Sequence, residues 1–386
     1  MSSSGDWLLR WLQALDQGQR GLLQALHALG LVGEQDGQPA WPWASRLAIE
    51  LLAIDRALAR SLLLTVAVAL LAMLLLLLGL AWRRGRRPVW TAAALAALLV
   101  FTLAPWGERS LLLADAVPTS FQSSPHAFSA AAIVQGESLY RQHCVACHGS
   151  EGSGDGPRAA SLAMWPPDLN SGLLGRRREG ELLRRVLQGL KDKQQRQTMP
   201  AFAGTLSTAQ AWQVLDYLQA QAAGQALRER GVWAQPVALP DLPVHCDGGP
   251  PRPLRSWTGQ RPRLVAADAA TALREDPRFV TIALRAPGDS RPAAGCEATG
   301  ADAWIAFARI AGVAPEALAG TQFIADREGW LRARSAPGQA GWRADDLVCR
   351  ADDATKAAPM PGDALDGLIA RMDQEPVRFV RAGVPH

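Results

Sequence analysis

Cysteine and histidine are scarce in this chain, which has only five Cys and six His among 386 residues. The charges nearly cancel, because 40 Lys and Arg residues face 36 Asp and Glu residues and leave a formal net charge of +4. A protein that binds nucleic acid concentrates Lys and Arg to neutralise phosphates, so this balance argues against a nucleic-acid partner. Where two scarce residue types do cluster, chance is a weak explanation.

Three of these scarce residues stand together in the run Cys144-Val-Ala-Cys147-His148. A C-x-x-C-H run is the covalent attachment site of a c-type haem. Two thiols three residues apart can each add to one vinyl group of a porphyrin, and the adjacent imidazole can then bind the iron. A structural zinc site would need a second Cys/His pair nearby, and a dithiol redox pair would precede a helix in a βαβ unit. Neither context is present, so the motif predicts one covalently bound haem c.

Residues 131–222 resemble class I cytochrome c domains, small all-α folds that wrap around one haem. The resemblance lies in the glycine-rich loop 149–157 and the Trp-Pro-Pro-Asp-Leu run at 165–169, which follow the motif. It implies that the carbonyl of Pro157 accepts the Nδ1 proton of His148 and so sets the tautomer of the imidazole. It also implies a haem pocket formed by Pro157, Pro166, Pro167, Leu169 and Phe202.

The second axial ligand of the iron is chosen from few candidates. Met199 stands before Pro200 in a polar loop and resembles the distal Met-Pro loop of class I cytochromes, which favours Met199 as the sixth ligand. Met164 is the rival, although a methionine before a proline run also suits packing in the pocket. Ligation by His and Met leaves no open coordination site, so we expect electron transfer rather than enzymatic catalysis.

Two helix patterns surround these motifs. Leu and Val recur at helical intervals over residues 179–190, and Ser207 with Gln210 forms the pattern of a capping box that opens the next helix. By resemblance, that last helix crosses the first one, at 136–142, with Gly136 close to Tyr217. Such a crossing would form the core of the predicted haem domain.

The segment 61–106 contains two apolar runs separated by a short basic turn. Residues 61–82 carry no charge and are long enough to span a bilayer, and the shorter run 89–106 is flanked by Trp90 and Trp106. We therefore expect a transmembrane helical hairpin, although the second run also suits a buried core helix. With the basic turn in the cytoplasm, everything after residue 106 lies in the bacterial periplasm. Residues 1–60 are predicted to be an amphipathic tail that lies on the membrane or packs on a partner, and residues 107–130 a linker.

After a second linker at 223–240, residues 241–386 resemble a thioredoxin-like α/β domain with the element order β-β-α-β-α-β-β-α. The domain is degenerate, because Asp268 and the residues after it stand where the family has its C-x-x-C pair. Outside the cytoplasm disulfides are permitted, and we expect Cys296 to pair with Cys349, since Cys246 lies at the other end of the domain by sequence order. A metal site at His245 is the weaker interpretation of that residue, because one His-Cys pair in a strand is usually structural.

Taken together, these features predict a multi-domain, membrane-anchored, monohaem electron carrier at the periplasmic face of the bacterial cytoplasmic membrane. Redox proteins are the expected partners, and the chain could be a subunit of a larger membrane oxidoreductase. The basic run 176–178 with Arg184 and Arg185 is either a solvated helix start or a patch that steers an acidic partner. The alternative function is a haem-containing redox sensor or assembly factor whose thioredoxin-like domain binds a client.

Overall fold

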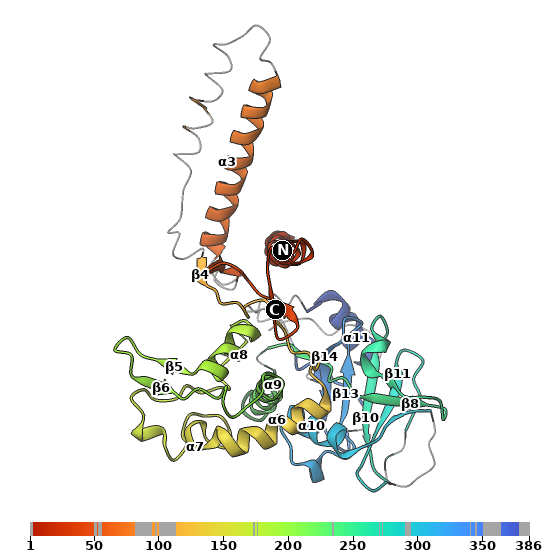
Figure 1. Cartoon of the computed structure of the whole chain (residues 1–386). Coiled ribbons are helices and arrows are strands. Elements are labelled where there is room, and N and C mark those ends of the chain that lie inside the picture. Colours follow the sequence, from red (N-terminus) through yellow and green to blue (C-terminus); the bar gives the residue numbers. More distant parts are fainter. Residues whose placement is uncertain are drawn as a thin grey trace.

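A computed structural model of this chain describes residues 3–49, 52, 56–81, 95–96, 99, 113–172, 174–175, 177–233, 235–269, 271, 273–289, 295–339, 341–343, 346–349 and 364–377. They form an N-terminal part that ends near residue 124, a helical half from α6 to α9, and a sheet half from β7 to α11 (Figure 1).

The N-terminal part packs against protein through two small apolar clusters. Leu12 is fully buried with Ile49 and Leu52, and the ring of Trp41 lies 4.4 Å from that of Phe121. Its elements are α1 (Ser3–Ala28), β1 (Glu34–Gln35), β2 (Gln38–Pro39), β3 (Ser45–Leu47), α3 (Arg56–Ala81) and β4 (Leu113–Asp115). Strand β4 pairs with β3, so residues predicted to be a linker are tied to the N-terminal tail.

The predicted transmembrane hairpin is corrected by the structure. No helix among the described residues is long and apolar enough to cross a membrane. The first turns of α3 also bury apolar surface in protein, since Ala59 belongs to the cluster of Leu12, and Leu62 and Leu63 pack against it. The predicted second run, 89–106, and the basic turn before it lie outside the described residues except for residues 95, 96 and 99.

The helical half is built on the crossing of α6 (Ala130–His143) and α9 (Thr208–Arg230). The helices approach closely at Gly136, where an added Cβ would lie 1.9 Å from the carbonyl oxygen of Gln213 and 2.9 Å from the Cβ of Tyr217. Ser207 and Gln210 form the predicted capping box at the start of α9. The expected crossing and cap are therefore confirmed. The other elements are α7 (Val145–His148), a 3₁₀ turn (Ala159–Ser161), α8 (Glu179–Gln188), β5 (Leu190–Lys191) and β6 (Gln197–Met199).

The sheet half contains one mixed eight-stranded sheet in the order β7-β14-β13-β10-β11-β12-β8-β9. Strands β10, β11 and β12 are parallel neighbours, and the other pairs are antiparallel. The strands are β7 (Val237–Ala238), β8 (Pro243–Cys246), β9 (Arg252–Pro253), β10 (Pro262–Ala267), β11 (Val280–Arg285), β12 (Cys296–Ala298), β13 (Gln322–Ala325) and β14 (Trp330–Ser335). The helices are α10 (Ala301–Ala311) and α11 (Ala364–Gln374), with 3₁₀ turns at Leu254–Trp257 and Pro315–Ala317.

This sheet overturns the predicted thioredoxin-like domain. The expected helix after the first central strand is absent from the described residues between β10 and β11. There the Thr271 hydroxyl donates to the carboxylate of Asp268 over 2.6 Å and accepts from its backbone N–H over 3.2 Å. Such local side-chain bonding competes with helix formation. The sheet is also wider than predicted, because it contains three further strands, β7, β9 and β12, and β12 lies between β11 and the predicted strand β8.

The disulfide joins different cysteines from the predicted pair. Cys246 bonds to Cys296, and Cys349 is a buried cysteine outside this disulfide, so the expected Cys296–Cys349 bridge is wrong. The reason is strand pairing: β8 lies antiparallel to β12 with Cys246 directly opposite Cys296, and their Cα atoms are 4.0 Å apart. By sequence order Cys246 was expected to lie far from Cys296. In the folded sheet, however, β8 is the direct neighbour of β12.

The helical and sheet halves share a hydrophobic core. Phe307 of α10 is buried in the same cluster as Ile133 of α6 and Ala220 of α9. At the edge of this contact, Arg309 forms an ion pair with Glu137 and donates to the side chain of Gln221 over 3.3 Å. Figure 1 shows α10 beside α6 and α9, so the helix that carries the Cys/His motif is packed on both sides by protein.

Candidate functional site

The Cys/His motif occupies a single helical turn at the end of α6. Cys144 ends α6 by donating its N–H to the Tyr140 carbonyl, and its own carbonyl accepts from the N–H groups of Cys147 (3.1 Å) and His148 (2.9 Å). The Tyr140 hydroxyl donates to the carbonyl of Gly149 over 2.8 Å and holds the start of the next loop. The two thiols and the imidazole are therefore held on one short, well-anchored turn, α7.

This turn faces a largely apolar cavity of about 280 Å³. The cavity brings together all four residues predicted to hold the cofactor, Cys144, Cys147, His148 and Met199. The predicted pocket residues Pro166, Pro167, Leu169 and Phe202 line it as well, but Pro157 does not. Further apolar walls come from Leu182 and Val186 of α8 and Val214, Leu215 and Leu218 of α9.

Burial favours the neutral forms of Cys144 and His148. It raises the pKa of the Cys144 thiol to about 12, with the neighbouring Cys147 adding to the effect. Burial also lowers the pKa of His148, and a backbone contact with Pro167 opposes that change only in part. The neutral imidazole is the form that binds metals. Thus the cavity presents an uncharged metal ligand beside two thiols.

The predicted hydrogen bond from His148 to Pro157 is not formed. Nδ1 of His148 is buried and has no hydrogen-bond partner within the described part of the chain, and the backbone contact that acts on this ring comes from Pro167. The loop instead packs on α7 through the N–H groups of Gly156 and Arg158, which donate to the carbonyls of Cys147 and Ala146. These bonds turn the chain at Pro157 away from the cavity wall.

Met199 is held beside the cavity by the end of α8. Gly189 ends that helix with φ 71°, and an added Cβ there would lie 2.4 Å from the carbonyl oxygen of Met199. The N–H of Phe202 then donates to the carbonyls of Val186 and Leu187, which pins the far side of the loop. Met199 is half-buried, whereas the rival Met164 is 58% exposed at the cavity rim. The arrangement therefore favours Met199 over Met164.

Comparison with known proteins matches the region of the chain that contains this site. Residues 131–218, which contain the motif, the cavity and Met199, match the family model described as cytochrome c oxidase, cbb3-type, subunit III. The chain carries a c-type cytochrome domain. No curated protein matches its sequence. A chain of the Kuenenia stuttgartiensis reducing HAO-like protein complex is similar over 36% of this chain and 63% of its own length, with 22% identity and a TM-score of 0.23, too low to support an argument.

The residues of the cytochrome domain fit a haem c. A porphyrin is a large apolar plate with a metal at its centre, and the cavity offers apolar walls, two thiols on one turn, a buried imidazole and a thioether. A cluster of three or more His, Cys, Asp or Glu side chains that could hold another metal ion does not occur among the described residues.

The arginines of the predicted basic patch lie in different environments in the fold. Arg178 is buried and forms an ion pair with Asp16 of α1, with its guanidinium 4.3 Å from the centre of the Phe121 ring. Burial alone would raise the pKa of Asp16, but the charges of Arg178 and Arg20 outweigh it and hold that pKa below its usual value. Arg184 stays exposed, and residue 176 lies outside the described residues. The patch as predicted, one surface of five arginines, is therefore wrong.

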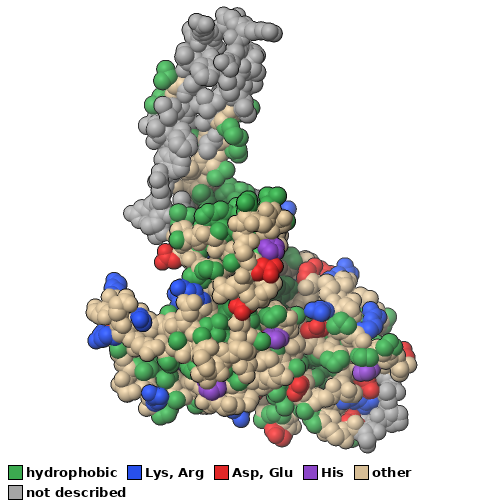
Figure 2. All heavy atoms as spheres, viewed as in Figure 1, with side chains coloured by type: hydrophobic (Ala, Val, Ile, Leu, Met, Phe, Trp, Pro, Cys, Tyr) green, Lys and Arg blue, Asp and Glu red, His purple; other side chains and the backbone are tan. Residues whose placement is uncertain are grey.

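Two arginines of that run belong to the haem cavity. Arg177 and Arg185 line it, although the sequence offered no sign that they differ from Arg178 and Arg184. Their position depends on where α8 starts and on which of its faces meets α9. Figure 2 shows Lys and Arg side chains gathered on the side of the molecule formed by α8, β5 and β6.

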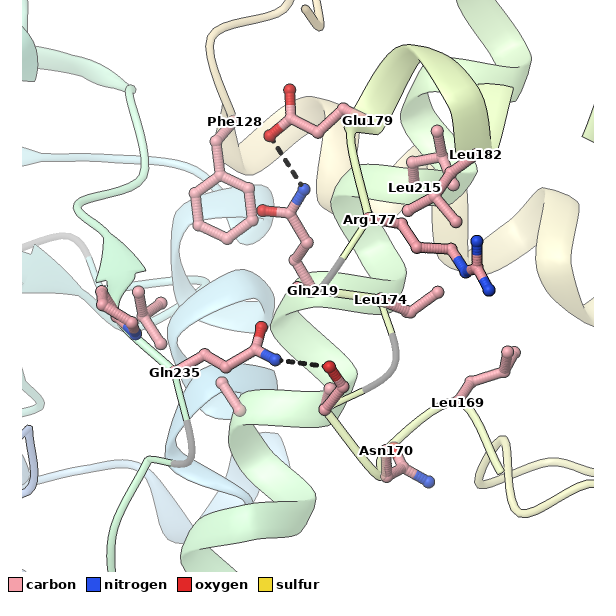
Figure 3. A pocket seen from close by; sticks show the side chains of 16 residues that line it. Phe128, Leu169, Asn170, Leu174, Arg177, Glu179, Leu182, Leu215, Gln219 and Gln235 are labelled. Atoms are coloured by element: carbon pink, nitrogen blue, oxygen red, sulfur yellow. Dashed lines mark hydrogen bonds between the residues drawn. The ribbon is translucent and has the colours of Figure 1, made fainter. Parts of the chain in front are cut away.

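A second, smaller cavity of about 90 Å³ adjoins the haem cavity, and the sequence did not predict it (Figure 3). The two cavities share Leu169, Leu174, Leu182 and Leu215 as an apolar wall. Its polar side is closed by Gln235, whose amide donates to the Gly172 carbonyl over 2.8 Å. Because Gln235 belongs to the segment that enters the sheet half, this segment helps to hold the loop beside the haem cavity.

Proposed function

We propose that this chain binds one haem c through thioether bonds to Cys144 and Cys147 and transfers single electrons. The observation that carries the proposal is the shared cavity of both thiols, His148 and Met199. The sequence contains one C-x-x-C-H run, which supports a single haem. When bound, the haem supplies a one-electron couple.

The protein residues have distinct parts in this proposal. Neutral His148 and Met199 would hold the haem iron. Pro166, Pro167 and Leu169 keep water from one face, and Leu182, Val186 and Phe202 form apolar walls around the ring. If both of these residues hold the iron, the protein would leave no site on the metal for a substrate. The proposal is therefore an electron-transfer protein rather than an enzyme.

Haem staining after denaturing gel electrophoresis tests the covalent attachment. Protein matured in a host with a cytochrome c assembly system should keep a peroxidase-active band in the presence of denaturant. Cys144→Ala with Cys147→Ala should abolish the band, whereas Cys349→Ala, a buried cysteine outside the motif, should retain it. A wild-type band without stain would refute the proposal.

We further propose that both halves work in the bacterial periplasm. Haem is attached to C-x-x-C-H motifs outside the cytoplasmic membrane, and a structural disulfide such as Cys246–Cys296 persists in oxidising compartments. Protease added to spheroplasts should therefore digest the protein, whereas intact cells should protect it. Protection in spheroplasts until lysis would place it in the cytoplasm instead.

Redox proteins are the proposed partners. The matched family is named for an oxidase subunit, which supports a role as the electron-carrying part of a larger oxidoreductase assembly. A haem-containing redox sensor is the second candidate, because α10 of the sheet half packs directly on the helix that ends in the motif. Carbon monoxide separates the two: a low-spin ferrous haem that does not bind it supports the carrier, and ready binding supports the sensor.

A further inference from the structure

The charged residues that line the haem cavity are all cationic. They are Arg158, Arg177 and Arg185, and no Asp or Glu is among the described residues of the cavity wall. Arg177 and Arg185 make no ion pair or side-chain hydrogen bond with a described residue, and Nε of Arg177 is buried without a partner. Half-buried arginines rarely stay unpaired in an apolar wall, because burial of an uncompensated charge is costly.

These two arginines also act on each other. The pKa of Arg185 is lowered mainly by burial and further by the nearby charge of Arg177, whereas the charge of Glu181 opposes this shift. Glu181 compensates the charge of Arg185 only in part, because its Oε1 atom accepts from Arg46 over 2.6 Å and from Ser120 over 3.2 Å. The cavity therefore holds two mutually repelling cations, and the carboxylate that acts on Arg185 is already paired with Arg46.

A third cavity beside these arginines has the same shortage of anions. Arg177 and Arg185 also line a cavity of about 490 Å³, together with Arg46, Arg184 and Lys191. Its acidic members are Asp115 and Glu181, and Asp115 is exposed at the rim. A ligand that neutralises both arginines must therefore come from the haem cavity or from solvent.

Haem itself carries the matching charges. Its two vinyl groups and its two propionate carboxylates lie on opposite edges of the porphyrin. The thiols that meet the vinyl groups sit on α7, and in Figure 1 α7 and α8 lie on opposite sides of the helical half. Arg158 belongs to the α7 side, since its N–H donates to the carbonyl of Ala146. The α8 side, with Arg177 and Arg185, is left for the carboxylates.

We propose that Arg177 and Arg185 bind the two haem propionates and, through their charge, raise the reduction potential of the iron. Arginine presents a planar fork of N–H donors that fits a carboxylate in two parallel hydrogen bonds. Two cations fixed at the haem edge stabilise the ferrous state, which carries one positive charge fewer. The inference rests on the proposed binding of haem c and assigns to this chain a binding site for its acidic groups.

Optical redox titration of the haem-loaded full chain tests the assignment. Arg177→Gln with Arg185→Gln should shift the ferrous/ferric equilibrium toward ferric by about tenfold, which is 59 mV for one electron. Arg184→Gln removes an exposed cation from the same helix and is the matched control, with a shift several-fold smaller. Infrared difference spectra should show a change in the propionate carboxylate stretch in the double variant and none in the control.

The outcomes separate this assignment from haem binding itself. If wild-type protein shows no covalent haem, the proposed function fails, and the arginines lose their ligand with it. If wild-type protein is loaded and the double variant matches Arg184→Gln in potential and spectrum, the propionate site is refuted while haem binding stands. A larger shift in Arg158→Gln would also refute it. Should the double variant lose haem, each single variant is expected to give about half of the shift.

Discussion

Arg309 of α10 forms an ion pair with Glu137 of α6, the helix that ends in the haem motif. The same carboxylate oxygen of Glu137 accepts from Arg141 one turn further along α6, over 2.7 Å. Arg309 is largely buried between the two halves, whereas Arg141 is 70% exposed. One carboxylate thus links the sheet half to the cytochrome domain and also holds a surface arginine.

This pair predicts an asymmetry between two arginine variants. Arg309→Ala should lower the free energy of unfolding by about 1–3 kcal/mol, because it leaves Glu137 and Gln221 buried with fewer donors. Arg141→Ala should cost less than about 0.5 kcal/mol, since an exposed ion pair contributes little. Denaturant titration followed by tryptophan fluorescence measures both values. Equal costs would mean that the interface does not depend on Arg309.

The axial ligand is tested with two methionine variants. Met199→Ala should abolish the iron–sulfur charge-transfer band and lower the reduction potential, because the thioether stabilises ferrous iron. Met164→Ala, at the exposed rim of the same cavity, should keep the band. If the two results were exchanged, Met164 would be the ligand. If neither variant changed the spectrum, another donor such as His143, which also lines the cavity, would hold the position.

The disulfide predicts a thiol count. Two of the five cysteines bind haem in the proposed state and two form the Cys246–Cys296 bond, so one free thiol, that of Cys349, should react in denaturant without reductant. Replacing Cys246 and Cys296 with Ser should lower the free energy of unfolding by about 2–4 kcal/mol, because the bond closes a long loop. Three reactive thiols in haem-loaded wild-type protein would contradict the pairing.

Asp216 predicts a pH dependence of stability. Its side chain accepts from the hydroxyl of Ser124 over 3.0 Å, and the residue is only 2% exposed. Burial raises the pKa of Asp216 to about 7, the Ser124 hydrogen bond opposes the rise, and Glu179 adds to it. Since the folded pKa exceeds the unfolded one, this residue should destabilise the fold progressively from about pH 4 to 7.

Two variants check that sign by unfolding experiments across pH. Asp216→Asn should remove this loss and make the protein more stable than wild type at pH 8. Ser124→Ala should enlarge the loss, because it removes a donor that favours the ionised carboxylate. If Asp216→Asn left the pH profile unchanged, Asp216 would be ionised in the fold without cost.

Interactions between near neighbours in the chain could be predicted from the sequence. The thiol spacing of the C-x-x-C-H run and the capping box of Ser207 and Gln210 depend on bonds within one helical turn, so their geometry follows from spacing alone. The approach at Gly136 could also be expected, by resemblance to known cytochromes. The prediction that residues 61–82 span a membrane is wrong. The length and composition of this run do not reveal that its first turns pack against Leu12 of α1.

The C-x-x-C-H motif and the order of the helices around it can be read from the sequence. Which cysteines pair, which arginines line the cavity and where the two halves join depend on the folded chain. Cys246 meets Cys296 because an edge strand returns beside β12, and Arg177 reaches the cavity while its neighbour Arg178 pairs with Asp16. Such contacts depend on packing between segments far apart in the chain, and no local spacing encodes them.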